Sequence, residues 1–151
     1  MRKHGFQRPF HPYQIFITTA TALSVIFFSI FVLPLLPEPA LATISSVYAI
    51  MFFVTVTVWA VLTGSNPSDP LEDPNKKHCS LCRLEVSERS RHCVRCGRCV
   101  VNLDHHCKWL NNCIGESNYR YFALLCVIFL LFSGLELISS IVVLSLSLIH
   151  I

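Results

Sequence analysis

The sequence has few charged residues. Only 14% of its 151 residues are Asp, Glu, Lys or Arg, whereas 53% are hydrophobic. Ordinary soluble domains carry about 25% charged residues, so the composition excludes that class and indicates a membrane protein. The sequence also contains no glycine-rich loop of the kind that binds phosphates, and no internal repeat is apparent.

Charge is almost absent from three long segments. Residues 15–36 and 40–63 carry none, and residues 121–149 carry only Glu136. Each segment exceeds the ~20 residues that a helix needs to cross the hydrocarbon core of a bilayer. The short, proline-rich link after the first segment favours an antiparallel helical hairpin. We therefore predict transmembrane helices over residues 14–36, 40–63 and 121–149.

The first segment has an alternative interpretation as a secretory signal. Arg2, Lys3 and Arg8 precede it, and Ala40-Leu41-Ala42 resembles a small-residue cleavage site. The apolar stretch is longer than the ~7 to 15 residues of a signal peptide, which favours an uncleaved helix.

Basic residues indicate the orientation, because Lys and Arg accumulate in short cytoplasmic loops. Three lie before the first predicted helix, none in residues 37–39, and nine in residues 64–120. We therefore expect residues 1–13 and the long loop to be cytosolic. Thiols stay reduced in that compartment, so clustered cysteines indicate metal binding or catalysis, and disulfides are the less favoured alternative.

Seven of the eight cysteines lie close together within this loop. Two Cys-x-x-Cys pairs with Cys and His downstream match the four nitrogen or sulfur ligands of tetrahedral zinc, and predict two sites. Two closed Cys3His sites use six thiols, so at least one cysteine is surplus. The candidate ligands are Cys79, Cys82, Cys93, Cys96, Cys99, Cys107, Cys113, His78, His92, His105 and His106.

One tetrapeptide carries more than metal ligands. Asp104-His105-His106-Cys107 places a carboxylate, two imidazoles and a thiol in consecutive positions. A thiol beside an imidazole that a carboxylate orients is a general nucleophile arrangement. A structural zinc module without chemistry is the commoner use of this spacing and stays the alternative.

These residues closely resemble the DHHC cysteine-rich domain of protein S-acyltransferases, the palmitoyltransferases. Two helices, a cytosolic loop and a third helix also resemble the topology of that family. The matching positions are Cys79, Cys82, Arg89, His92, Cys93, Cys96, Cys99, Asp104 to Cys107, Trp109, Asn111 to Gly115, Asn118 and Tyr119.

The resemblance implies a role for each matching residue. One zinc ion would be held by Cys79, Cys82, His92 and Cys99, and the other by Cys93, Cys96, His106 and Cys113. Cys107 would be the nucleophile, His105 its base, and Asp104 the residue that orients His105. The co-substrate would be an acyl-CoA such as palmitoyl-CoA, and the chain would carry palmitate on Cys107 as a thioester before passing it to a substrate cysteine.

The resemblance also implies an architecture and a location. We expect an α-helical integral membrane protein with three transmembrane helices. A linker at 64–78 and a small cytosolic double-zinc domain of short β-hairpins at 79–120 would lie between helices 2 and 3. The expected partners are the lipid bilayer and proteins with membrane-proximal cysteines, in the ER or Golgi. Nucleic acid is not expected, because the recognition-helix spacing of DNA-binding zinc fingers is absent.

Departures from the family pattern favour a second hypothesis. Lys108 stands where many members have proline, as in a subgroup that reads Cys-Lys-Trp-Leu-Asn-Asn-Cys, and Ser87 replaces another frequent proline with little expected effect. The sequence ends at Ile151, without the usual fourth helix, which predicts a chain truncated after its third helix. The alternative function is therefore a non-catalytic zinc-containing membrane adaptor or an inactive truncated isoform.

Three polar features have simpler interpretations. Glu136 is costly in lipid, and we expect it to face a neighbouring helix and find a polar partner. Tyr13 is typical of a membrane interface, and His11 has no evident partner. The loop cations could attract CoA phosphates, although compensation of zinc thiolates and attraction to anionic lipid are favoured for most of them. These cations are Arg89, Arg91, Arg95, Arg98 and Lys108.

Overall fold

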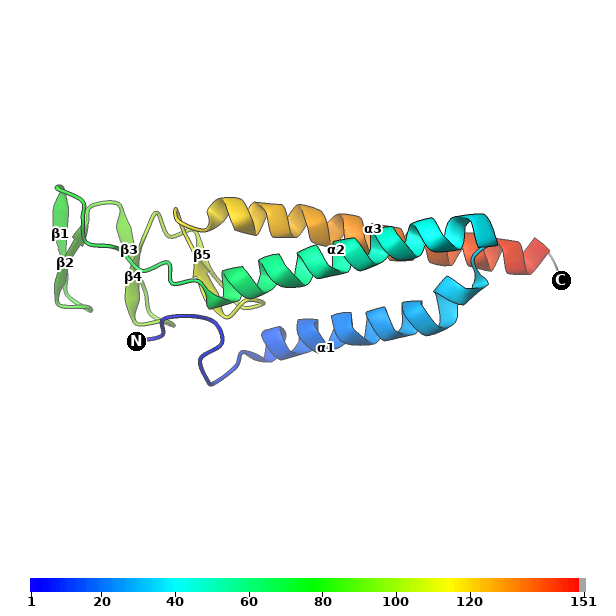
Figure 1. Cartoon of the computed structure of the whole chain (residues 1–151). Helices are drawn as coiled ribbons and strands as arrows, with labels where there is room; N and C mark the ends of the chain where they lie inside the picture. The colour runs from blue at the N-terminus through cyan, green and yellow to red at the C-terminus, as the bar shows by residue number, and fades with distance from the viewer. Residues whose placement is uncertain (150–151) are drawn as a thin grey trace. The chain divides into compact units, whose positions relative to one another are not determined.

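The computed structural model describes residues 1–149, which form two compact units (Figure 1). The cysteine-rich unit consists of residues 1–15 and 59–123. The helical unit consists of residues 16–58 together with the described residues from 124 onward.

Three helices are long and apolar enough to cross a membrane. Helix α1 (Pro12–Phe27) continues through a π-helical turn (Phe28–Val32) and a 3-10 turn (Leu33–Leu35). Helix α2 spans Glu38–Gly64 and α3 spans Tyr119–Ile149. The predicted fold class, three such helices with a cysteine-rich hairpin region between the second and third, is confirmed.

Aromatic rings form the core of the helical unit. Phe28, Tyr48 and Phe132 are buried, one from each helical segment, with ring centroids 4.6 Å apart for Phe28 and Tyr48 and 5.0 Å apart for Tyr48 and Phe132. Most other large apolar side chains of these helices are exposed, as Phe53 and Leu130 are at 71%. Such a surface is stable when lipid rather than water covers it.

Glu136 joins the three helices of this unit. Its carboxylate accepts hydrogen bonds from the Tyr48 hydroxyl and the Ser24 hydroxyl, each at 2.7 Å. An unsatisfied carboxylate would be costly in a bilayer. The expectation that Glu136 finds a polar partner is confirmed.

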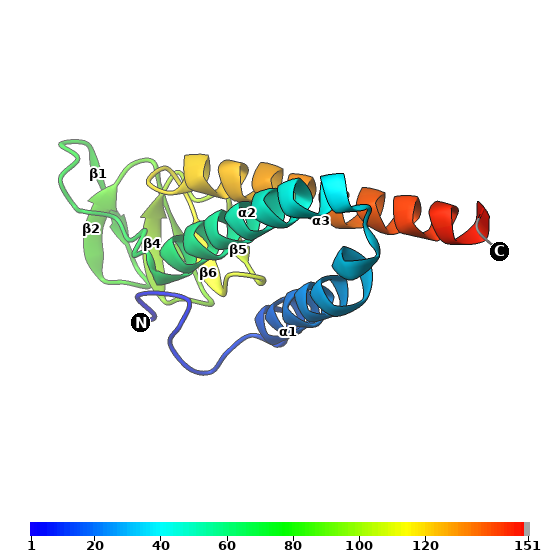
Figure 2. The ribbon, with the colours of Figure 1, turned by 45° about the vertical axis from the view of Figure 1, so that its right-hand side comes forward.

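Three antiparallel hairpins build the cysteine-rich unit and follow one another along it (Figure 2). They pair β1 with β2, β3 with β4, and β5 with β6. The strand bounds are Lys76–Cys79, Leu84–Ser87, Ser90–Cys93, Arg98–Val101, His105–Cys107 and Asn112–Ile114.

The hairpins repeat at an interval of 14 residues. Each turn begins at a cysteine that pairs with the residue five positions later, in the order Cys79 with Leu84, Cys93 with Arg98, and Cys107 with Asn112. The residue four positions after each cysteine has a positive φ, which only glycine adopts without strain. The prediction that no internal repeat exists is wrong, because the hairpins repeat and a His-Cys pair recurs with them at 78–79, 92–93 and 106–107. The residues with positive φ in the three turns are Arg83, Gly97 and Asn111.

Two buried side chains attach the end of α2 to the hairpins. The last carbonyls of a helix have no partner within it. The Asn112 amide donates to the Leu62 and Ser65 carbonyls, both at 2.9 Å. The Arg98 guanidinium, 1% exposed, donates to the Asn112 side-chain oxygen at 2.5 Å and to the Lys3 carbonyl at 2.6 Å. The N-terminal segment, α2 and two hairpins therefore meet at one buried polar centre.

Candidate metal centres and active site

Eight cysteine and histidine side chains form two clusters. Within each cluster all the potential ligand atoms lie within 4.8 Å of one another. Three thiols and one imidazole at this spacing suit tetrahedral zinc. The clusters have the same membership as the two ligand sets that the resemblance implies. They consist of Cys79, Cys82, His92 and Cys99, and of Cys93, Cys96, His106 and Cys113.

Strand alternation explains why neighbouring residues join different clusters. Successive side chains of a strand point to opposite faces. In β3, His92 lies opposite Cys99 and shares the first cluster with it, while Cys93 belongs to the second. In β5, His106 lies opposite Cys113 in the second cluster. His105 and Cys107 therefore share the other face of β5.

The 14-residue repeat gives the rule for both clusters. Each takes both thiols of one Cys-x-x-Cys turn, then a histidine and a cysteine from the next hairpin. Cys107 occupies the first thiol position of a third such turn, where Leu110 stands in the second position and is 2% exposed. Cys107 belongs to neither cluster: the second thiol of its turn is missing, and α3 rather than a further hairpin follows β6 in the described chain.

The protonation of the second cluster also suits a cation. Hydrogen bonds with the Cys93 and Cys96 sulfurs raise the pKa of His106 to about 9. Hydrogen bonds with Cys113 and Cys96 lower the pKa of Cys93, so the cluster pairs a thiolate with the His106 imidazolium, and a divalent ion bound there would take the place of the imidazole proton.

The candidate catalytic residues follow one another along the chain, with Asp104 directly before β5 and with His105 and Cys107 as the first and last residues of that strand. The Asp104 carboxylate and His105 Nδ1 are 3.1 Å apart. Nδ1–H donates to the carboxylate in this pair, which leaves the lone pair on Nε2. Phe122 packs its ring edge-to-face with His105 at 5.2 Å. Cys107, on the same strand face as His105, is 4% exposed.

An open cavity of about 730 Å³ lies beside Asp104. Among the described residues, three of its lining cations form no ion pair, whereas Arg89 lies 2.9 Å from the Glu116 carboxylate. The three cations are Lys77, Arg91 and Arg120. Glu88, Glu116 and Asp104 also line the cavity, so four cations and three carboxylates leave it with a small net positive charge.

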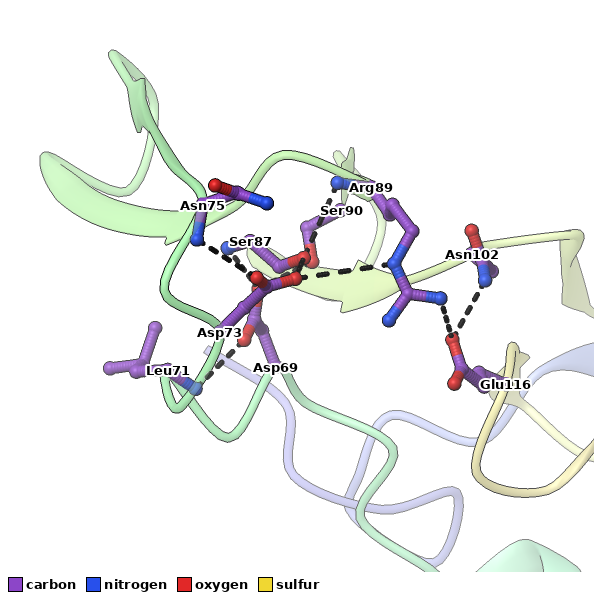
Figure 3. A network of polar contacts seen from close by, with 9 residues as sticks. All are labelled: Asp69, Leu71, Asp73, Asn75, Ser87, Arg89, Ser90, Asn102 and Glu116. Carbon is purple, nitrogen blue, oxygen red and sulfur yellow. Dashed lines mark hydrogen bonds and ion pairs between the residues drawn. The ribbon is translucent and has the colours of Figure 1, made fainter.

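Sequence reasoning missed a polar network that attaches the linker to the hairpins (Figure 3). Asp69 accepts hydrogen bonds from the Ser90 hydroxyl and from the Ser87 N–H at 2.8 Å. The Ser87 hydroxyl donates to Asp73 at 2.5 Å. Proline at position 87 would lack both donors, so the expectation of little effect from Ser87 is wrong.

The pKa values of the two aspartates reflect this network. Burial raises the pKa of Asp69, but hydrogen bonds from the Ser90 hydroxyl and from the Leu71 and Ser87 amides outweigh it, so the pKa falls below its usual value. The Ser87 hydroxyl is the largest cause of the lowered pKa of Asp73. Asp69 and Asp73 each accept a hydrogen bond from the N–H two residues ahead, in a turn that Asp often forms. The two aspartates in the linker are therefore the sequence signal that could have indicated these turns.

Comparison with known proteins places this site in a family. The model of the DHHC palmitoyltransferase family matches residues 72–150. Palmitoyltransferase ERF2 of Kluyveromyces lactis is 41% identical over 86 residues, 52% of this chain and 23% of the relative. Palmitoyltransferase swf1 of Schizosaccharomyces pombe is 53% identical over 64 residues, 41% of this chain and 17% of the relative.

A vertebrate relative gives a similar result. Palmitoyltransferase ZDHHC23-A of Danio rerio is 46% identical over 65 residues, 42% of this chain and 16% of the relative. The chain thus covers less than a quarter of the length of each of these three relatives. The family model covers more than half of the chain, and the chain belongs to the DHHC palmitoyltransferase family.

Proposed function

We propose that this chain transfers a long-chain acyl group from acyl-CoA to cysteines of other proteins through a thioester on Cys107. One observation carries the proposal. Asp104 and His105 form a carboxylate–imidazole pair at 3.1 Å, and Cys107 shares the strand face of His105 while every other cysteine of the hairpins belongs to a cluster.

The first step loads the nucleophile. The neutral His105 ring carries a lone pair on Nε2, which can take the thiol proton of Cys107. The thiolate attacks the thioester carbonyl, a new carbon–sulfur bond forms, and the bond to the CoA sulfur breaks. The CoA thiolate leaves with the proton from His105.

The second step transfers the acyl group. The thiol of a substrate cysteine gives its proton to His105, and its sulfur attacks the carbonyl on Cys107. The bond to Cys107 breaks, and the proton returns to the Cys107 thiolate. Asp104 keeps the His105 tautomer fixed and stabilises the imidazolium in both steps. Ping-pong kinetics follow from this order.

Two zinc ions would occupy the clusters and supply structure rather than reactivity. The two ions would fix eight ligand residues from the three hairpins. The hairpin segment has a small hydrophobic core, so metal binding would supply much of its stability. His106 would thus hold β5 in the register that places His105 and Cys107 on one face.

The cavity beside Asp104 suits the phosphates of CoA. Lys77, Arg91 and Arg120 line it and pair with no carboxylate of the described chain. Clustered cations attract anionic ligands electrostatically. Arg91 could bind CoA phosphates or compensate the charge of zinc thiolates and attract anionic lipid, and its place in the cavity favours binding of CoA phosphates.

A membrane location fits the same reaction. Each buried CH2 of an acyl chain contributes about 0.8 kcal/mol, so a palmitoyl group is held better in a bilayer than in water. The distribution of Lys and Arg supports a cytosolic location for the N-terminus and the hairpins, where acyl-CoA and protein cysteines are available. The proposed location is the ER or Golgi, and the proposed partners are proteins with cysteines close to the membrane.

Purified chain in detergent, incubated with palmitoyl-CoA that is labelled in its acyl group, should acquire the label as a thioester that hydroxylamine cleaves. Cys107→Ser should abolish the uptake, and Cys126→Ser, an exposed position in α3 outside both clusters, should leave it intact. Uptake that persists in Cys107→Ser excludes the assignment. Metal-loaded, folded chain that takes up no label supports the zinc-containing adaptor instead.

A further inference from the structure

Three basic side chains meet near the beginning of α1. The Arg95 guanidinium nitrogen Nη1 lies 3.3 Å from His11 Nε2. The Lys108 Nζ lies 5.4 Å from the centroid of the Tyr13 ring, and that ring is 5.3 Å from the His11 ring. Tyr13 also stacks on Trp109 at 5.0 Å. His11, Arg95 and Lys108 are named the basic cluster below.

The contact between His11 and Arg95 is a hydrogen bond at 3.3 Å. A guanidinium has no acceptor, so Nη1 of Arg95 donates to Nε2 of the neutral His11 ring. This bond uses one of the five N–H donors of the guanidinium. The remaining donors and the Lys108 ammonium can donate to an oxygen of an anion.

The described chain contributes no anion to this place. Neither Arg95 nor Lys108 forms an ion pair with any carboxylate in residues 1–149. Burial, then the charges of Arg95 and Lys108, lower the pKa of His11. The cluster is thus a site of uncompensated positive potential.

The position of the cluster identifies its ligand. His11 directly precedes the candidate membrane span Pro12–Leu35, and Tyr13 lies within its first turn. Stacked Tyr and Trp rings are typical of the level of lipid head groups. Arg95 and Lys108 contact these residues, so they reach the same level.

We propose that Arg95, which His11 holds in place, and Lys108 bind the phosphate of an anionic phospholipid, with the Tyr13 and Trp109 rings against the adjoining lipid. A head group with net negative charge is preferred over phosphatidylcholine, because Arg95 and Lys108 attract a net negative charge, whereas the phosphatidylcholine head group has none. The site is separate from the cavity lined by Lys77, Arg91 and Arg120. The proposal therefore does not depend on the acyl-transfer chemistry.

Fluorescence of Trp109 can test the site directly. The chain has two tryptophans, so Trp59→Phe leaves Trp109 as the only reporter. The chain is reconstituted in phosphatidylcholine vesicles that contain increasing fractions of brominated phosphatidylserine, or of brominated phosphatidylcholine as reference. Stronger quenching by the serine lipid at equal fraction is expected, and it should weaken as salt rises. Equal quenching by both lipids at low salt overturns the proposal.

Matched variants separate this site from general charge effects. The double variant Arg95→Gln with Lys108→Gln removes two charges from the cluster. The loss of each charge should lower the preference for the serine lipid by about fivefold. Lys76→Gln with Arg83→Gln removes two charges from the first hairpin and should leave the preference unchanged. Equal losses in the two variants contradict the proposal.

Two further measurements keep the test decisive. Both double variants should keep the metal content of the parent, which shows that the hairpins are folded. If the cluster variant loses metal, Arg95→Lys with Lys108→Arg replaces it and should keep the preference. Free CoA added to the parent should not reverse the quenching, and reversal assigns the cluster to CoA phosphates and overturns the lipid proposal.

Discussion

His92 and Cys93 follow one another in β3, yet their side chains belong to different ligand clusters. The alternation of a strand separates them, and the hairpin register brings each to its own partners. The same alternation in β5 directs His106 to a cluster and leaves His105 and Cys107 together on the other face. Metal binding and the proposed chemistry thus depend on one structural rule.

Removing one thiol should empty one cluster. Cys96→Ser should lower the zinc content from about two ions per chain to about one, because a closed site needs four ligands. It should also abolish acyl uptake, since the second cluster holds His106 and hence β5. Cys126→Ser is the matched control. Elemental analysis of purified chain gives the metal content, and an unchanged content in Cys96→Ser contradicts the assignment of ligands.

A single substitution should convert the third turn into a metal-binding turn. Leu110→Cys restores the second thiol position beside Cys107, and the two thiols should bind added zinc in an open site that water completes, because no further hairpin of the described chain supplies the other two ligands. Micromolar zinc should then block alkylation and acylation of Cys107. Leu110→Ala, which loses about 2 to 5 kcal/mol of packing energy without adding a ligand, is the control and should not respond to zinc. Equal responses in both variants would show that the repeat has no bearing on Cys107.

The linker network should stabilise the hairpins at neutral pH. Asp69→Asn replaces a buried acceptor of three hydrogen bonds and should cost about 1 to 3 kcal/mol. Hydrogen exchange of the Ser87 amide, which donates to Asp69, measures the loss. Asp73→Asn should cost less, because Asp73 is the less buried of the two carboxylates.

The lowered pKa of Asp69 fixes the pH dependence of this effect. A carboxyl whose pKa is lower in the folded state contributes stability above its unfolded pKa of about 3.9 and loses it as pH falls through the folded pKa. The difference between the parent and Asp69→Asn should therefore stay constant from pH 8 to pH 5. A difference that shrinks within that range would indicate a raised pKa instead.

Glu136 should stabilise the helical unit through its two hydrogen bonds. Glu136→Leu leaves the Tyr48 and Ser24 hydroxyls without this acceptor and should cost about 1 to 2 kcal/mol, since hydrogen bonds between membrane helices contribute about 0.6 kcal/mol each, with a maximum near 1.7. Glu136→Gln keeps an acceptor oxygen and should cost less. Thermal unfolding in detergent compares the two, and equal losses would show that volume alone matters.

Much of the fold could be predicted from residue type alone. Three long apolar segments with Glu136 as their only charged residue predict membrane-spanning helices, and clustered cysteines and histidines predict metal binding or chemistry. The ends of the helices could not be predicted as well. Helix α3 begins at Tyr119, before the predicted apolar segment, because polar residues can also be helical. The bend after α1 into a π turn likewise leaves no mark in hydropathy.

The site shows where sequence reasoning ends. Spacing identified the candidate ligands, but their division into two sets came from the resemblance, because several divisions satisfy the same spacing. The strand register of His92 and Cys93 supplies the physical reason. The bonds from Ser87 to the linker and the contact between His11 and Arg95 join residues distant in sequence, so only the fold shows them.

The most direct test of the account locates the acyl group. Chain incubated with palmitoyl-CoA is digested and analysed by mass spectrometry, then chased with a cysteine peptide. The account predicts one palmitoyl group on the peptide that contains Cys107, lost to the acceptor peptide during the chase and absent from His105→Ala. Palmitate found only on another cysteine, or a Cys107 thioester that no acceptor removes, would contradict it.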